Sequence, residues 1–268
     1  MTFLETVVLG IVQGLTEFLP VSSSGHLILV PAALGWSPPG LAFTVAAHVG
    51  TLLAVVVYFR EDLRRLIVGT ARWFVSRGRN GNDEFGLVLA LALGTIPAAI
   101  VGLALESSVE EMFNSVTLAG AALAATAVVL LVAESLHRAD NNTAQVAWWQ
   151  AAIIGCAQAA AVIPGLSRSG MTIAAGLLCG LPRQLAARFA FLLSVPIIAG
   201  AGAKEALNIA SSNVPPSEWG WLPLGAAVSA VAGLAAIAVV LRAVQSRGLR
   251  WFALYCALVA AAAVSITG

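Results

Sequence analysis

Residues 13–26 read Gln-Gly-Leu-Thr-Glu-Phe-Leu-Pro-Val-Ser-Ser-Ser-Gly-His, a cluster of polar side chains inside an otherwise apolar segment. Gln13 and Glu17 are four residues apart, so they share one face of a helix. Pro20 disfavours continuation of that helix, and the serines and glycine at 22–25 are residues that commonly begin a new one. The stretch therefore predicts helix, break, helix, with an acid and several hydroxyl groups gathered at the break.

The composition points to the membrane. The chain has 268 residues, of which 59% are hydrophobic and only 10% are charged. Soluble domains carry about 25% charged residues, so we expect a polytopic membrane protein. The formal net charge is +1, and no basic run suggests nucleic acid as a partner. The three cysteines lie in apolar stretches without Cys-x-x-Cys spacing, which indicates neither a disulfide framework nor a thiolate metal site.

The first residues lack a basic region and a signal-peptidase site, so we expect them to belong to the mature chain. Apolar stretches at 3–19 and 24–36 flank the break, and each is shorter than the about 20 residues that a crossing helix needs. They predict a re-entrant hairpin, which is tolerated where it is buried in protein or lines a wet cavity. Stretches 147–163 and 169–180 flank a second polar break in the same way. Longer apolar stretches predict six crossing helices, at 41–59, 85–104, 117–137, 188–204, 222–243 and 251–267.

The two halves of the chain match at an offset of 145 residues. This offset places Gln158 on Gln13, and Ser167-Arg168-Ser169-Gly170 on Ser22-Ser23-Ser24-Gly25. The second copy lacks counterparts of the acid and the imidazole and carries an arginine instead. We therefore predict an internal repeat with specialised halves. The predicted boundaries are a single membrane domain at 1–268, with repeat 1 at 1–140 and repeat 2 at 145–268.

The relative orientation of the repeats follows from counting. A hairpin that returns to its own side adds no crossing, and three crossings per half is an odd number, so the halves must be inverted. If the arginine-rich amphipathic stretch 60–84 is cytoplasmic, so are the predicted loops 138–146, 181–188 and 242–250. That side then holds 12 of the 14 basic residues, which obeys the positive-inside rule with both termini outside. The predicted fold is an all-α polytopic membrane protein, an inverted repeat in which each half is a re-entrant helical hairpin plus three transmembrane helices.

Inverted repeats with broken helices place a site near the bilayer midplane, where the breaks meet. Arg168, the one arginine inside a break, offers a planar fork of donors for phosphate oxygens, and two helix N-termini would direct N–H groups at the same anion. Glu17 and Gln13 supply hard oxygens for a magnesium or calcium ion held jointly with substrate phosphates. A serine hydroxyl beside a histidine is a nucleophile with a base. The set predicts phosphoryl transfer and comprises Gln13, Glu17, Ser22, Ser23, Ser24, His26, Ser167, Arg168, Ser169 and Thr172.

Each of these residues also has a structural interpretation. Glu17 would serve as an acid paired with Arg168, His26 would satisfy one buried hydrogen bond, and each serine would cap a helix. For His48, within a crossing helix, a packing role and a role in supporting the site are equally favoured. The combination favours a functional site because two repeats break at the same place with complementary charges.

Residues 13–26 resemble the (Glu/Gln)-x-x-x-Glu motif and the following Ser/His segment of the undecaprenyl-diphosphate phosphatases, the BacA/UppP family. Pro164-Gly165-Leu166-Ser167-Arg168-Ser169-Gly170-Met171-Thr172 resembles the second motif of that family, Pro-Gly-x-Ser-Arg-Ser-x-x-Thr. The resemblance spans nearly the whole chain, with Gln13 in place of a glutamate and therefore one fewer carboxylate for metal. It implies an integral membrane hydrolase that removes the terminal phosphate of undecaprenyl diphosphate. The monophosphate product is the lipid carrier recycled for peptidoglycan synthesis, and high activity confers bacitracin resistance.

The resemblance also implies a role for each site residue. Gln13 and Glu17 would hold a divalent cation, magnesium or calcium. Ser23 would be the candidate nucleophile and His26 its acid/base, although attack by another hydroxyl or by water is left open. The implied catalytic residues are Glu17, Ser23, His26 and Arg168. The implied substrate-binding residues are Ser22, Ser24, Gly165, Ser167, Arg168, Ser169 and Thr172.

A member of this family is expected in the bacterial inner (plasma) membrane, as a multi-pass protein whose site opens to the periplasmic side. Its partners would be a polyprenyl diphosphate lipid and membrane lipid, without nucleic acid, and a homodimer is left open. Two rivals remain. A secondary transporter shares the inverted repeat and broken helices but has no need of Ser23 with His26. The acid-phosphatase-like lipid phosphatases share only Ser24-Gly25-His26, and the rest of their motifs is absent.

Overall fold

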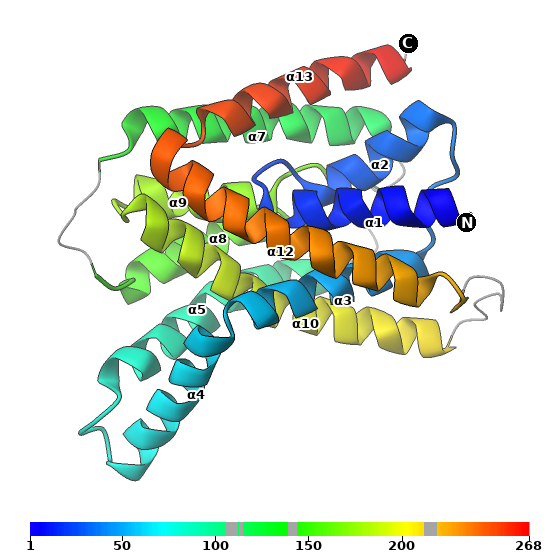
Figure 1. The fold of residues 1–268 in the computed structure, drawn as a ribbon. Helices are drawn as coiled ribbons and strands as arrows, with labels where there is room; N and C mark the ends of the chain where they lie inside the picture. The colour runs from blue at the N-terminus through cyan, green and yellow to red at the C-terminus, as the bar shows by residue number, and fades with distance from the viewer. Residues whose placement is uncertain (106–111, 113–114, 139–143, 212–218, 268) are drawn as a thin grey trace.

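The computed structural model describes residues 1–105, 112, 115–138, 144–211 and 219–267, and among these residues there are helices and no β-strand (Figure 1). The helices are α1 (Phe3–Phe18), α2 (Ser23–Leu34), α3 (Leu41–Tyr58), α4 (Arg60–Val75), α5 (Asn82–Ala104), α7 (Val116–Leu136), α8 (Trp148–Ala160), α9 (Arg168–Leu178), α10 (Arg183–Ser211), α12 (Leu222–Arg247) and α13 (Arg250–Thr267). The predicted all-α class is confirmed.

Five of the described helices are long and apolar enough to cross a membrane, namely α3, α5, α7, α10 and α12. The sixth predicted crossing, α13, is apolar but shorter. Its 18 residues rise by about 27 Å, close to the hydrocarbon thickness of about 30 Å. The chain is thus a polytopic membrane protein. Both termini lie at the same end of the bundle, on the right in Figure 1, which agrees with the count of crossings.

Two predicted loops are wrong in their extent. The segment 181–188 was expected to be a loop because it carries two arginines, but α10 begins at Arg183. The Arg183 guanidinium donates two hydrogen bonds to Glu134, at 2.6 and 2.8 Å. Arg188 pairs with Asp62 at 2.6 Å. These partners on α7 and α4 let both arginines lie within the helix. Likewise α12 continues to Arg247, through most of the predicted loop 242–250.

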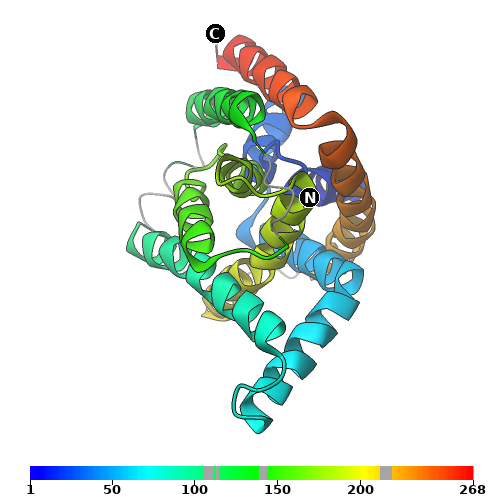
Figure 2. The same cartoon turned by 90° about the vertical axis from the view of Figure 1, so that its left-hand side faces the viewer.

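The two hairpins are built from helices too short to cross. α1 and α2 have 16 and 12 residues, and α8 and α9 have 13 and 11. α9, yellow-green in the end-on view of Figure 2, is surrounded by other helices. Hydrogen bonds from the start of α2 to the α8–α9 loop, and from the start of α9 to the α1–α2 loop, show that the two breaks meet. The hairpins and their meeting point are as predicted.

The second helix of each hairpin begins with the same cap. The Ser22 hydroxyl accepts a hydrogen bond from the Gly25 N–H at 3.2 Å, and the Ser167 hydroxyl accepts one from the Gly170 N–H at 3.0 Å. These are N-caps, which satisfy backbone donors that have no partner within the helix. The two caps lie 145 residues apart, at the offset of the predicted repeat.

Each hairpin packs against a helix of the other half of the chain. α1 packs against α12, and α8 packs against α5. This reciprocal packing, in which each hairpin contacts a helix of the other half, is what a two-fold relation between the halves would produce. The inverted orientation of the halves, and the boundaries 1–140 and 145–268, stay predictions.

The core next to the α1–α2 loop is aromatic. Phe18 is buried edge-to-face against Phe191, with 5.7 Å between the ring centroids.

α4 and the first half of α5 form an arm that projects from the bundle (Figures 1 and 2). The Trp73 and Phe85 rings stack at 3.8 Å and hold the arm together near its tip. The outer face of α4 is apolar at Ile67, Phe74 and Val75, which are exposed. The predicted amphipathic stretch 60–84 is therefore this arm.

Candidate functional site

The site is built where the two polar loops touch. The Ser24 hydroxyl accepts a hydrogen bond from the Gly165 N–H at 3.1 Å, and the Ser169 hydroxyl donates one to the Leu19 carbonyl oxygen at 2.9 Å. Each bond joins a serine in the first turn of one helix to the backbone of the opposite loop. The N-termini of α2 and α9 are thereby fixed side by side, and both present backbone N–H groups to the same region.

An ion pair lies at this junction. Arg168 Nη2 donates to Glu17 Oε1 at 2.6 Å, and only 15% and 5% of the two side chains are exposed. Charges this deeply buried are costly unless paired, so removal of either side chain would leave an uncompensated charge inside the bundle. The alternative that Glu17 pairs with Arg168 is therefore realised, and the pair occupies the centre of the predicted site.

The second oxygen of Glu17 gathers the other polar groups of the first hairpin. Glu17 Oε2 accepts hydrogen bonds from Ser23 Oγ at 2.6 Å and from Gln13 Nε2 at 2.9 Å. His48 Nε2 lies 3.7 Å from the same oxygen, within ion-pair distance when the imidazole is protonated. Of the two interpretations of His48, the geometry favours support of the site over packing.

His26 faces away from Ser23. Its Nδ1 lies 2.7 Å from the Ser22 carbonyl oxygen, and its Nε2 lies 2.8 Å from the Tyr255 hydroxyl. Ser23 instead donates to Glu17. The predicted hydrogen-bonded pair of Ser23 and His26 is therefore not formed in this arrangement, because both ring nitrogens already have partners. The carboxylate of Glu17, and not the imidazole, is the base within reach of Ser23.

In the second hairpin the hydroxyl groups bond mainly to nearby backbone. Ser167 Oγ caps α9 and lies 3.3 Å from Ser169 Oγ, as Ser22 Oγ lies 3.2 Å from Ser24 Oγ in the first hairpin. Thr172 Oγ1 donates to the Arg168 carbonyl oxygen at 2.8 Å, within its own helix. The geometry thus gives most of the predicted phosphate-binding hydroxyls a structural role as well.

Two buried polar atoms beside the ion pair have no hydrogen-bond partner in the described part of the chain: Gln13 Oε1 and Arg168 Nη1. Buried polar atoms are almost always satisfied, so an acceptor and a donor left over at one junction point to a ligand. An amide oxygen suits a hard cation, and a guanidinium N–H suits a phosphate oxygen.

Comparison with known proteins agrees with this chemistry. The family model described as "Bacitracin resistance protein BacA" matches residues 6–262, which is nearly the whole chain. The chain belongs to the BacA family. Both polar loops and all of the side chains described above lie within the matched region.

Relatives within the BacA family cover almost the same length. The undecaprenyl-diphosphatase of Thioalkalivibrio sulfidiphilus is 44% identical over 95% of each chain. The undecaprenyl-diphosphatase of Geobacter sulfurreducens is 45% identical over 95% of this chain and 94% of its own. That of Pelobacter propionicus is 43% identical over 99% of this chain and 97% of its own.

A metal ion fits the BacA junction only together with substrate. The described residues contain no cluster of three or more His, Cys, Asp or Glu side chains that could hold an ion by themselves. The carboxylate of Glu17 and the unpartnered oxygen of Gln13 are nevertheless adjacent hard donors. Magnesium commonly takes one or two carboxylates plus substrate phosphates and water, so this donor set suits an ion shared with a diphosphate.

Two further residues shape the loops and were not predicted from the sequence. Thr126 on α7 accepts a hydrogen bond from the Ser167 N–H at 3.2 Å, and Tyr255 on α13 contacts His26. Both are polar residues in the apolar middle part of their helices. A polar group in the apolar interior needs a partner, which is the signal that could have singled them out.

Gly165 occupies a position that only glycine fits. Its φ is +94°, and a Cβ there would lie 2.6 Å from the Ala119 carbonyl oxygen and 2.8 Å from the Ala122 Cβ. Its N–H also bonds to Ser24. Gly165 therefore matters because the α8–α9 loop passes directly against α7, which brings the loop within reach of the first hairpin.

Replacing Gly165 with alanine is expected to destabilise the fold by more than about 2 kcal/mol, because left-handed backbone strain adds to a clash with backbone. Gly35→Ala is the matched control, since Gly35 has φ +66° and nothing within 4 Å of a Cβ; it should cost only about 1 kcal/mol. Thermal unfolding of the purified proteins in detergent measures both. Equal unfolding midpoints for the two variants would contradict the close contact of Gly165 with α7.

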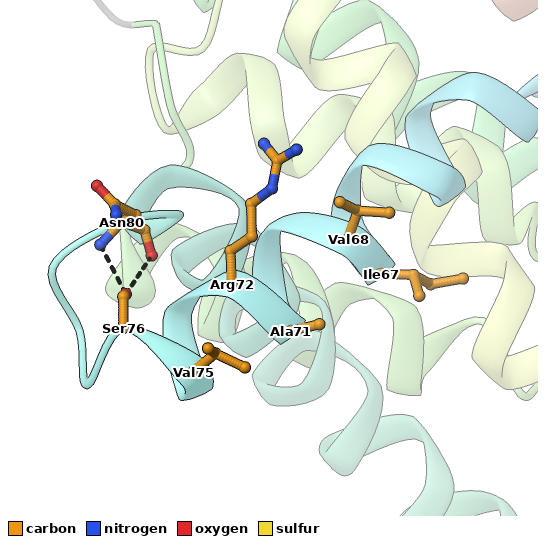
Figure 3. A pocket seen from close by; sticks show the side chains of 7 residues that line it. All are labelled: Ile67, Val68, Ala71, Arg72, Val75, Ser76 and Asn80. Atoms are coloured by element: carbon orange, nitrogen blue, oxygen red, sulfur yellow. Dashed lines mark hydrogen bonds between the residues drawn. The ribbon is translucent and has the colours of Figure 1, made fainter.

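A surface pocket of about 410 Å³ lies on the arm, apart from these loops (Figure 3). It is lined by Ile67, Val68, Ala71, Arg72, Val75, Ser76 and Asn80. Ser76 Oγ accepts a hydrogen bond from the Asn80 N–H at 3.0 Å, which closes the turn at the tip of α4. None of the predicted site residues lines this pocket, so it is no part of the candidate active site.

Proposed function

We propose that this protein is an undecaprenyl-diphosphate phosphatase, which removes the terminal phosphate of the lipid diphosphate and returns undecaprenyl phosphate for peptidoglycan synthesis. Membership of the BacA family and the names of its close relatives support this activity. The single observation that carries it is the Glu17–Arg168 pair with Ser23 hydrogen-bonded to the same carboxylate. Release of phosphate would lower sensitivity to bacitracin, as the description of the family suggests.

Arg168 is proposed to bind the terminal phosphate without releasing Glu17. Its Nη2 is committed to the carboxylate, and its Nη1 is buried and free to donate to a phosphate oxygen. The N-termini of α2 and α9 add backbone N–H groups and positive dipole ends beside it. Charge neutralisation and positioning account for most of the catalysis of phosphoryl transfer, so this arrangement would supply the larger part of the rate enhancement.

Ser23 is the proposed nucleophile and Glu17 its base. As Ser23 Oγ bonds to the terminal phosphorus, its proton passes to Glu17 Oε2, 2.6 Å away. The bond from that phosphorus to the bridging oxygen breaks, and undecaprenyl phosphate leaves as an anion. Glu17 then releases this proton to solvent. Water attacks the phosphoserine and gives one proton to Glu17 as its hydroxyl bonds to phosphorus; the bond from phosphorus to Ser23 Oγ breaks, Glu17 returns the proton to Ser23 Oγ, and inorganic phosphate is released. Direct attack by water would use the same carboxylate oxygen as base.

Gln13 and Glu17 are the residues proposed to hold a magnesium or calcium ion, through the unpartnered amide oxygen and the carboxylate. When bound, such an ion neutralises charge on the diphosphate as the anhydride bond breaks.

The protein would act in the bacterial plasma membrane with its site open to the periplasmic side, an orientation supported by the 12 basic residues assigned to the opposite side. The lipid tail can then stay in the bilayer while the diphosphate enters the polar junction.

Removal of divalent cations is expected to lower phosphate release by at least about 100-fold, because an ion supplies several kcal/mol of charge stabilisation. Purified protein in detergent would be assayed with undecaprenyl diphosphate in magnesium, in calcium and in chelator. Gln13→Ala should raise the magnesium concentration needed for half-maximal rate. Gln150→Ala is the control, since the Gln150 amide bonds to the Cys179 carbonyl oxygen, away from the site.

Full activity in chelator would remove the ion from the proposal and leave the hydrolysis standing. Folded protein that releases no phosphate with either ion would contradict the hydrolysis itself. That result would favour the alternative that the protein is a secondary transporter.

A further inference from the structure

His26 is held by two hydrogen bonds that fix its protonation pattern. A carbonyl oxygen can only accept, so Nδ1, at 2.7 Å from the Ser22 carbonyl oxygen, carries the hydrogen. A neutral imidazole then has an unprotonated Nε2, which accepts a hydrogen bond from the Tyr255 hydroxyl at 2.8 Å. Both nitrogens are satisfied with no charge on the ring, and the side chain is buried, with only 5% of the residue exposed.

The partner of His26 on the backbone is strained. Ser22 has φ +70°, a region that residues other than glycine rarely adopt. Such a conformation persists only where the surroundings enforce it. His26 Nδ1 anchors the Ser22 carbonyl, and Gly25 N–H anchors its hydroxyl. The peptide that follows this carbonyl leads to Ser23, so its orientation decides where the Ser23 hydroxyl points.

Tyr255 approaches from the last helix, α13. Its ring lies nearly parallel to that of His26, with 6° between the planes and 5.6 Å between the centroids. The next residue, Cys256, is buried and donates a hydrogen bond from Sγ to the Pro20 carbonyl oxygen at 3.6 Å. Two successive residues of α13 therefore contact the first hairpin: Tyr255 contacts His26 in the first turn of α2, and Cys256 contacts Pro20 in the α1–α2 loop. The C-terminal helix thus packs directly against the segment that carries Ser23.

We infer that Tyr255 is a positioning residue for phosphate release, acting through His26, and that His26 holds the Ser22–Ser23 peptide instead of exchanging protons with substrate. The inference rests on the proposed function. Three hydrogen bonds connect these residues: from the Tyr255 hydroxyl to His26 Nε2, from His26 Nδ1 to the Ser22 carbonyl oxygen, and from Ser23 Oγ to Glu17. Tyr255, 232 positions further along the sequence, therefore helps to orient the Ser23 hydroxyl toward Glu17.

Two substitutions of His26 separate positioning from acid/base catalysis. His26→Asn keeps an N–H donor at the place of Nδ1 and cannot exchange protons, whereas His26→Gln places its amide near Nε2 and loses the anchor on Ser22. We expect His26→Asn to keep kcat within about 10-fold of the wild type and His26→Gln to lose at least about 100-fold. The pH profile of kcat/KM should have the same shape in His26→Asn and in the wild type.

Tyr255→Phe should lower kcat about 10-fold and change KM less than twofold, because it removes one hydrogen bond that does not touch substrate. The chain contains only two tyrosines, so Tyr58→Phe is a matched control. Tyr58 lies at the end of α3 with 38% exposed, against 43% for Tyr255. It should retain wild-type kinetics.

Nitrogen NMR of protein labelled in its three histidines tests the arrangement without any turnover. His48 Nδ1 and His137 Nδ1 also lie beside carbonyl oxygens, of Thr44 and Leu177, so all three imidazoles of the wild type should be protonated at Nδ1. The His26 signal is the one that is absent in His26→Asn, and it should be altered in Tyr255→Phe. Loss of activity in His26→Asn equal to that in His26→Gln, with both variants folded, would overturn the inference. A His26 signal protonated at Nε2, or a Tyr255→Phe protein with unchanged kcat and spectrum, would do the same. Wild-type protein that shows the Nδ1 signal and yet releases no phosphate would contradict only the proposed function.

Discussion

Replacing Arg168 with alanine is expected to lower kcat/KM for phosphate release from undecaprenyl diphosphate by at least about 10³-fold. The guanidinium is proposed to bind the terminal phosphate and to neutralise charge that develops on it, and loss of an arginine in that role typically costs about 10³- to 10⁵-fold. The substitution also leaves Glu17 as a buried carboxylate without its 2.6 Å partner. Because that bare charge repels a diphosphate, KM should rise as kcat falls.

The matched control for this experiment is Arg188→Ala. Arg188 also forms a 2.6 Å ion pair, with Asp62, but 42% of its side chain is exposed and the pair lies away from the polar loops. Its loss should change stability by no more than about 1 kcal/mol and leave activity intact. Arg168→Lys should recover only part of the rate, since lysine supplies the charge without the planar fork. An Arg168→Ala protein that is folded and near normal in activity would remove the proposed phosphate site.

Glu17→Gln is expected to lower kcat by at least about 10³-fold. Unlike Arg168→Ala, it should not weaken substrate binding. The amide keeps the shape of the side chain but cannot accept the proton of Ser23, and loss of a positioned base costs about 10²- to 10⁴-fold. Arg168 loses its counter-charge at the same time, so in saturating magnesium, where the weaker ion site of the variant is still filled, it should bind the diphosphate at least as tightly as before. The predicted signature is a collapse of kcat with an unchanged or lower KM, measured in the same phosphate-release assay.

Glu134→Gln serves as the control for Glu17→Gln. Glu134 accepts two hydrogen bonds from Arg183 and one from the Leu249 N–H, in an ion pair that joins α7, α10 and the start of α13. Its neutralisation should reduce thermal stability and spare catalysis. If Glu17→Gln raised KM and left kcat unchanged, Glu17 would act in substrate binding and not as the base.

The sequence predicted the position of the site because local signals and the repeat agree there. Ser22 and Ser167 are helix starts by residue type, and they lie at the offset that also aligns Gln13 with Gln158. In the structure both serines cap helices, and the two breaks that they end are in contact. A proline and capping residues within apolar sequence fix a break wherever they occur, so little tertiary information was needed to find it.

The partners of the site residues were harder to predict. His26 and Ser23 are close in sequence, and proximity suggested that they act together. The partner of His26 is instead Tyr255, 229 residues away. A single tyrosine in an apolar helix gives no indication of the residue that it will face, because that depends on how α13 packs against α7 and α2. Pairings across the bundle are set by packing, which one sequence does not encode locally.

Helix ends were least well predicted where charges lie inside helices. Arg183 and Arg188 suggested a loop because arginine at a membrane boundary usually marks one. Their ion pairs with Glu134 and Asp62 satisfy the charges within the bundle, and α10 extends through both positions. The error lies in the helix boundary, and the inverted topology stays a prediction.

The central claim is that the junction of the two breaks is where the terminal phosphate is removed. The most direct test follows undecaprenyl diphosphate by phosphorus NMR with equal amounts of folded wild-type, Glu17→Gln, Arg168→Ala and Arg188→Ala protein in magnesium. We predict that the wild type and Arg188→Ala convert the lipid to its monophosphate with one inorganic phosphate per molecule, and that the two site variants leave it intact. Conversion at the wild-type rate by either site variant, or no conversion by the wild type, would contradict the account.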